Sequence, residues 1–170
     1  MPRLHVCSLA LIAETVEKTG ARSLVTLLSP GTEVGRPIEI RPERHLYLAV
    51  SDIVEPMPGQ VLAESGHLDD LLRFVRAWDR AAPMLIHCFA GVSRSTAAAY
   101  IAACALEPKR DEFAIARSLR AASPTASPNT RLVALADDAL GRGGRMSEAI
   151  AGIGRGEACF EGAPFALELN

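Results

Sequence analysis

The chain lacks the features that mark several large protein classes. Its 170 residues include 18 Lys or Arg and 20 Asp or Glu, so it has no basic excess for binding nucleic acid or a membrane surface. It begins with neither the basic flank nor the long apolar core of a signal peptide, and it has no apolar stretch long enough to span a bilayer. We therefore expect a cytoplasmic protein without nucleic-acid or membrane partners.

Cysteine is scarce, and its spacing excludes two further classes. The chain has four cysteines, with no Cys-x-x-Cys pair and no histidine at metal-ligand spacing. We expect neither a disulfide framework nor a metal site, and no cofactor. A reducing compartment fits this pattern. The four are Cys7, Cys88, Cys104 and Cys159.

Strand-like runs alternate with helical patterns along most of the chain. Length and a hydrophobic content of 49% suit one domain, residues 1–170. Alternation of this kind predicts an α/β fold, with a mostly parallel central sheet flanked by helices on both faces. The oligomeric state stays open. Strands are expected at residues 4–8, 22–28, 45–50 and 84–88, with a short one at 38–40.

Helices are expected between and after these strands. The pattern is clearest where leucines recur at helical spacing and Trp78 continues the same face. C-terminal helices and a tail occupy residues 130–170, and we expect the tail to pack against its own domain. The predicted helices span residues 9–19, 60–80, 95–105, 111–121, 130–140 and 146–154.

The chemistry is concentrated in residues 83–95, PMLIHCFAGVSRS. An apolar strand ends at Cys88, and a loop of five residues leads to Arg94 at the start of an alanine-rich helix. Such a loop can turn its backbone N–H groups toward one centre, and the helix N-terminus adds more. This nest suits a tetrahedral dianion, with Arg94 binding two of its oxygens. The expected phosphate-binding residues are Phe89, Ala90, Gly91, Val92, Ser93 and Arg94.

Cys88, at the base of this nest, is a candidate nucleophile. The positive field that binds phosphate also favours thiolate over thiol, and His87 and Ser95 are placed to tune it. A thiolate beneath a phosphate can form a cysteinyl-phosphate. The simpler interpretation, a buried strand cysteine before a helix cap, requires the strand, Gly91, Arg94 and the helix to coincide by chance.

Residues 87–95 resemble the signature loop of the cysteine-based protein tyrosine phosphatases. The form His-Cys-x-Ala-Gly-x-Ser-Arg-Ser resembles the dual-specificity branch, and the alanine- and arginine-rich composition suggests a bacterial member. The resemblance is strong over residues 46–105 and weak beyond about 135. It implies a protein tyrosine phosphatase-like fold and hydrolysis of phosphotyrosine, with phosphoserine or phosphothreonine also possible. It further implies that His87 is buried and supports the loop, and that Ser95 bonds the Cys88 sulfur.

A phosphatase of this kind needs an acid for the leaving group. The resemblance places that acid on an upstream loop, after the preceding strand. Asp52 fits this position, and it shares with Cys88 a location at the carboxyl end of a strand. A solvated turn aspartate is the simpler interpretation of Asp52. The alternative acids are Glu55 and, less suitably because they fall within an amphipathic helix, Asp69 and Asp70.

Asn129 follows Pro128 and precedes an apolar helix. This pair resembles the Pro-Asn element that supports the signature loop in dual-specificity enzymes. A helix N-cap is an equally good interpretation.

Two other functions stay open. A rhodanese-like or arsenate-reductase-like enzyme would also place a cysteine in an anion-binding loop, and the reductase would need a resolving cysteine such as Cys104 or Cys7. A module without catalysis would only bind phosphate. For a phosphatase, the partner is a phosphorylated substrate, either a phosphotyrosine protein or a small phosphomonoester.

Overall fold

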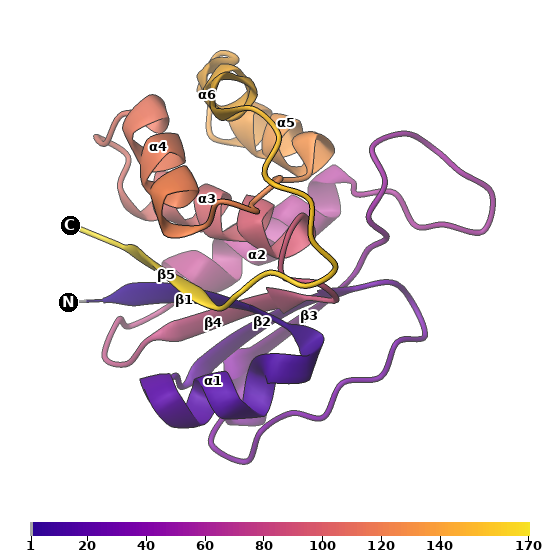
Figure 1. Cartoon of the computed structure of the whole chain (residues 1–170), viewed down its shortest axis with the longest axis vertical. Helices are drawn as coiled ribbons and strands as arrows, with labels where there is room; N and C mark the ends of the chain where they lie inside the picture. Colours follow the sequence, from indigo (N-terminus) through magenta and orange to yellow (C-terminus); the bar gives the residue numbers. More distant parts are fainter. Residues whose placement is uncertain (1) are drawn as a thin grey trace.

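Figure 1 shows the fold of the chain in a computed structural model that describes residues 2–170. Five strands form one sheet in the order β3-β2-β4-β1-β5, of which β5 alone runs antiparallel to its neighbour. The prediction of a mostly parallel sheet in an α/β domain is confirmed. The strands are β1 (Arg3–Ser8), β2 (Ser23–Leu28), β3 (His45–Ala49), β4 (Met84–Cys88) and β5 (Phe165–Glu168).

The helices lie on both faces of this sheet. In Figure 1, α1 covers one face and the other helices gather on the opposite face. Within residues 2–170, no helix combines the length and apolarity that crossing a bilayer requires. The α-helices are α1 (Ile12–Thr19), α2 (Ser65–Arg76), α3 (Arg94–Leu106), α4 (Glu112–Ala122), α5 (Thr130–Ala139) and α6 (Arg145–Ile153), and the 3-10 turns are η1 (Leu9–Leu11) and η2 (Pro42–Arg44).

The alanine-rich α3 is the central helix of the fold. Ala97 through Cys104 are completely buried, including Tyr100. A helix that is surrounded by neighbours must be apolar on all sides. It packs against α2, α4, α5 and strands β1 and β4, and its small side chains allow this close approach. The helix that follows the signature loop is therefore fixed along its whole length.

Two predicted elements were wrong in extent or type. Residues 38–40 form a turn rather than a strand, in which Ile40 is buried and Ile38 is exposed. The helix expected at 60–80 covers only Ser65–Arg76. It starts there because Glu64 and His67 form a capping box. Beyond its end, the Trp78 indole N–H donates to the Ala82 carbonyl at 3.0 Å.

The tail packs against its own domain, as the sequence predicted. Strand β5 pairs with β1, and Leu167 and Leu169 are buried. Its apolar residues alternate with polar or small ones, a pattern too short to be recognised as a strand in the sequence alone. The tail thereby closes the edge of the sheet beside β1.

Candidate active site

The predicted site residues lie where the parallel strands end. Strand β4 ends at Cys88, and its register partner on β1 is Ser8. Strand β3 ends two residues before Ser51, and Asp52 follows. The carboxyl ends of parallel strands lie at one edge of a sheet, so these side chains share an edge. The structure thus places Cys88 and Asp52 at the same edge of the sheet, where Asp52 contacts the signature loop through Ser93.

The signature loop, residues 87–95, turns four carbonyl groups outward onto neighbouring segments. All peptide bonds in the described chain are trans, and the N–H of a trans peptide points away from its carbonyl. The N–H groups of the following residues therefore point toward the inside of the loop, as an anion nest requires. The outward bonds are Leu9 N–H to Phe89 O (3.1 Å), Gly162 N–H to Ala90 O (2.9 Å), Ser127 N–H to Val92 O (3.0 Å) and Asn129 N–H to Ser93 O (3.1 Å).

Gly91 is required at the turn of this loop. Its φ is +71°, a conformation that side chains disfavour. A Cβ at this position would also lie 2.9 Å from the backbone of Cys7 and Ser8. The close approach of the loop to the end of β1 therefore depends on glycine.

Arg94 presents one side of its guanidinium to the protein and leaves another unpaired. Its Nη1 donates to the Val50 carbonyl at 3.0 Å. The residue is only 7% exposed, and its Nε is buried with no hydrogen-bond partner among residues 2–170. An unpaired buried donor costs about 1–3 kcal/mol. An oxyanion with two acceptor oxygens would satisfy this group.

The Cys88 sulfur lies beside the first turn of α3. It is 2% exposed, and its Sγ is 3.1 Å from the Oγ of Ser95, which is completely buried. The Ser95 hydroxyl can donate to this sulfur, since a thiolate is an acceptor. The predicted contact between these two residues is therefore present.

Both ring nitrogens of His87 form hydrogen bonds within the protein. Its Nδ1 lies 3.1 Å from the Cys88 carbonyl, so we assign the proton to Nδ1. Its Nε2 then accepts from the Thr26 hydroxyl at 2.8 Å, and Thr26 in turn accepts from His45 Nε2 at 2.7 Å. Burial lowers the pKa of His87 to about 4. The ring is thus neutral and supports the backbone of the loop.

The free energy of unfolding should decrease as the pH is lowered, because of His87. Between its ordinary pKa of 6.5 and about 4, the unfolded chain binds a proton that folded His87 does not. The shift corresponds to roughly 3 kcal/mol, which is present above pH 6.5 and is lost as the pH falls toward 4. Urea unfolding at pH 7 and pH 4.5 should show a smaller difference for His87→Asn than for the wild type. An equal difference in both proteins would contradict this prediction.

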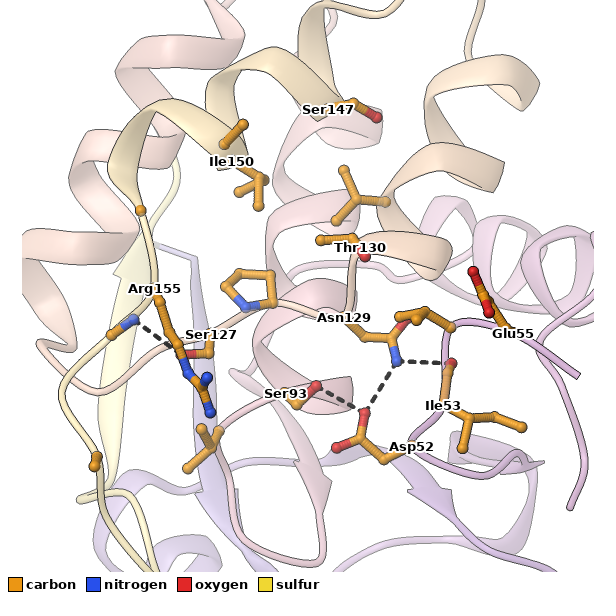
Figure 2. Close-up of a pocket in the computed structure, with 18 of the residues that line it drawn as sticks. Asp52, Ile53, Glu55, Ser93, Ser127, Asn129, Thr130, Ser147, Ile150 and Arg155 are labelled. Atoms are coloured by element: carbon orange, nitrogen blue, oxygen red, sulfur yellow. Dashed lines mark hydrogen bonds between the residues drawn. The ribbon is translucent and has the colours of Figure 1, made fainter. Parts of the chain in front are cut away.

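Asp52 is tied to the signature loop and to α5. Its Oδ1 accepts from the Ser93 hydroxyl at 2.7 Å and from Asn129 Nδ2 at 3.0 Å, as Figure 2 shows. The same Nδ2 donates to the Ile53 carbonyl at 3.2 Å. Asn129 Oδ1 accepts from the Leu132 N–H at 3.0 Å and caps α5. Both interpretations of Asn129 therefore apply, because one amide caps the helix and holds Asp52.

The alternative acids are placed less well. In Figure 2, the carboxylate of Glu55 points away from Asp52 and the signature loop. Asp69 and Asp70 are exposed on α2, where Asp70 pairs with Arg73 at 3.0 Å. Among the predicted candidates, Asp52 alone is bonded to the signature loop.

A pocket of about 1080 Å³ opens beside Asp52 and Ser93. Figure 2 shows the loop of Asp52, helices α5 and α6 and the tail around it. A volume of this size is typical of a ligand site. Aliphatic side chains line much of it, including Ile53, Val54, Val92, Val133 and Ile150.

Two of the other cysteines are buried and inert. Burial raises the pKa of Cys7 and of Cys104 to about 12, so both stay as thiols. Cys7 packs in the core beneath α1, and Cys104 is enclosed within α3. In the part of the chain that the structure describes, no three His, Cys, Asp or Glu side chains are grouped to hold a metal ion.

Sequence reasoning missed the outer supports of the loop. Leu9, Ser127 and Gly162 contribute through backbone N–H groups, which have no side-chain signal in a sequence. Thr26 reaches His87 only because β2 and β4 pair in one register. A continuous β-prone run around Thr26 was the only available signal, and it indicated a strand.

Part of the sequence matches a known family. Residues 58–127, which contain the signature loop, match the family model described as protein-tyrosine phosphatase. No curated protein matches the chain.

Three solved structures share the fold. The Cydia pomonella PTP-2 phosphatase is 21% identical with a TM-score of 0.60, covering 79% of this chain and 84% of its own. Human DUSP28 is 20% identical with a TM-score of 0.61, covering 82% and 88%. A mouse putative dual specificity phosphatase, complexed with zinc tungstate, is 20% identical with a TM-score of 0.57, covering 81% and 79%.

At these identities the solved structures establish the fold, and the family model adds the sequence of the loop at the end of β4. The matched residues 58–127 include the signature loop that holds Cys88 and Arg94. Residues 58–127 are thus similar to the protein-tyrosine phosphatase family, and the chain has the fold of these three phosphatase structures.

Proposed function

We propose that this protein is a phosphomonoester hydrolase, a protein tyrosine or dual-specificity phosphatase that acts through a cysteinyl-phosphate on Cys88. The observation that carries the proposal is the unpaired, buried Nε of Arg94 beside a loop whose N–H groups turn inward next to the Cys88 sulfur. This arrangement suits an anion with several acceptor oxygens at the sulfur.

In the first step, the Cys88 thiolate attacks phosphorus and the bond to the leaving oxygen breaks. Asp52 donates its proton to that oxygen, so the leaving group departs as an alcohol or phenol. Arg94 and the N–H groups of the loop bind the three other oxygens while charge shifts among them. The products of this step are the alcohol and the cysteinyl-phosphate.

In the second step, water attacks the cysteinyl-phosphate. Asp52, now a carboxylate, takes a proton from the water, and the sulfur–phosphorus bond breaks to release inorganic phosphate. The Ser95 hydroxyl at 3.1 Å donates to the departing sulfur and stabilises it as a thiolate. Neutral His87 takes no proton, because both of its ring nitrogens are engaged with the protein.

The pocket beside Asp52 is where the leaving group would extend. The acid must touch the leaving oxygen, and this pocket begins at Asp52 and Ser93. Its aliphatic lining suits a phosphotyrosine ring and the apolar residues next to it.

The competing functions fit fewer of these features. A sulfur transferase needs no acid for a leaving oxygen, so that function does not account for the Asp52 carboxylate that is bonded to the signature loop. An arsenate reductase needs a resolving thiol, and the two cysteines predicted for that role, Cys7 and Cys104, have pKa values raised by burial. The direct test is turnover of p-nitrophenyl phosphate against turnover of thiosulfate. Turnover of thiosulfate alone would refute the phosphatase proposal.

Asp52→Asn should lower turnover most for substrates with poor leaving groups. We expect kcat for phenyl phosphate to fall about 10²- to 10³-fold, because a phenoxide needs a proton to depart. The loss should be much smaller for p-nitrophenyl phosphate, whose leaving group is stable as an anion. Steady-state kinetics with a series of aryl phosphates measures this dependence.

Glu55→Gln distinguishes the two candidate acids in the same assay. If Glu55→Gln shows the dependence on the leaving group and Asp52→Asn does not, the assignment of Asp52 is wrong. Asp69→Asn, on the exposed face of α2, is the control for a lost surface carboxylate.

A further inference from the structure

The segment between α6 and β5 contacts the signature loop directly. We call residues 156–162 the C-terminal strap. In Figure 1 it descends from α6 past the carboxyl ends of the strands before it enters β5. Figure 2 shows its first part against Ser127, whose Oγ accepts from the Gly156 N–H at 2.9 Å. The strap therefore runs alongside two loops of the site.

One backbone bond joins the strap to the loop. The Gly162 N–H donates to the Ala90 carbonyl at 2.9 Å. Because Ala90 O points outward, the N–H of Gly91 in the same peptide unit points inward. The three other outward carbonyls are held by segments nearer the start of the chain or by the loop before α5. Gly162 thus fixes one of the four inward N–H groups.

Glycine is required at this contact for space. Gly162 is buried, and a Cβ there would lie 2.8 Å from the Gly91 carbonyl oxygen. Gly156, at the other end of the strap, has a similar restriction, with a Cβ only 2.5 Å from Thr125 backbone atoms. The strap is therefore in close contact at both ends, but only Gly162 contacts the signature loop.

A side-chain bond holds the strap beside the nucleophile. The Ser8 hydroxyl donates to the Glu161 carboxylate. Ser8 is 1% exposed and is the register partner of Cys88 on the neighbouring strand. This bond places Glu161, and with it Gly162, against the end of β1 next to the loop.

We propose that the C-terminal strap is a positioning element of the phosphate site, with Gly162 as its positioning residue. The inference rests on the proposed function. Without the Gly162 N–H, the peptide between Ala90 and Gly91 can rotate. Rotation would bring a carbonyl oxygen, with its partial negative charge, toward the phosphate oxygens and remove an N–H donor.

The test measures the affinity for inorganic phosphate by calorimetry in the Cys88→Ser background, where chemistry does not interfere. Gly162→Ala should weaken binding about tenfold, since one donor to an anion is lost. With Cys88 present, it should lower kcat/KM for p-nitrophenyl phosphate by at least a similar factor. Gly152→Ala, in α6 and outside the strap, is the control for a glycine substitution, because a Cβ there meets no other atom, and its effect should stay below about threefold.

A second variant keeps both glycines. Glu161→Ala, with an exposed side chain, should weaken phosphate binding about threefold through loss of the Ser8 bond, and Glu157→Ala should not. Unchanged affinity in Gly162→Ala, or equal weakening in both glycine variants, would overturn the inference. If Gly162→Ala alone weakens phosphate binding but the wild type hydrolyses no phosphomonoester, the proposed function fails and the role of the strap stands.

Discussion

Cys88→Ser is expected to lower turnover of phosphomonoesters about 10⁵-fold while phosphate affinity stays within about threefold. A serine hydroxyl is a far weaker nucleophile than a thiolate unless a base removes its proton. His87, the adjacent histidine, cannot act as that base. Its Nδ1 is bonded to the Cys88 carbonyl and its Nε2 to Thr26, and burial lowers its pKa to about 4. The nest and Arg94 remain, so the anion still binds.

Single-turnover kinetics and calorimetric titration with inorganic phosphate measure the two halves of this result. Acid quenching during turnover should capture a phosphoprotein in the wild type and none in the variant. Cys104→Ser is the matched control, because this cysteine is also completely buried but lies within α3. Comparable activity of Cys88→Ser and wild type would contradict a covalent mechanism.

The fold was predictable where local patterns are strong. The apolar runs at β2 and β4 and the break at Gly20 after α1 gave correct elements, because burial on two faces and a left-handed cap leave clear signals. Residues 38–40 were wrongly predicted to form a strand because Ile40 is apolar, but this side chain is buried in a turn and not in the sheet. The end of α2 was missed because Trp78 continues the apolar pattern beyond the last helical turn.

Site residues that are close together in the sequence could be predicted, whereas contacts between distant residues could not. Residues 87–95 are contiguous, so nucleophile, arginine and loop could be placed from one motif. Asp52 could be placed from topology, because parallel strands end at one edge. The contacts that orient these groups join distant residues, such as Asn129 to Asp52 across 77 positions and Thr26 to His87 across 61. Pairing of that kind follows from register and packing, which a single sequence does not display.

The strap illustrates this limit most clearly. Its contribution to the loop is a backbone N–H, and its sequence requirement is the absence of a side chain at Gly162. Neither property distinguishes this glycine from the other 12 in the chain until the fold places it beside Gly91.

Arg94→Lys is expected to lower kcat/KM about 10³-fold, or about 4 kcal/mol of transition-state stabilisation. Lysine keeps the positive charge but has one nitrogen where arginine offers a planar fork. With Nη1 of Arg94 held by Val50, the unpaired Nε marks the side of the fork that meets the oxyanion. A single ammonium cannot hold the Val50 carbonyl and two phosphate oxygens together. Steady-state kinetics with p-nitrophenyl phosphate and competitive inhibition by inorganic phosphate measure the loss.

Arg142→Lys separates this effect from the general cost of altering a buried arginine. Arg142 is 8% exposed, but its Nη1 pairs with Glu112 at 2.7 Å, away from the signature loop. We expect it to lower the free energy of unfolding and leave phosphate affinity nearly unchanged. Arg94→Met should have the opposite profile, with activity lost and the free energy of unfolding within about 1 kcal/mol of the wild type, because loss of the Val50 bond is offset by removal of an unpaired buried donor. If Arg94→Met loses as much stability as Arg142→Lys, the main role of Arg94 is to support the fold and not to bind the anion.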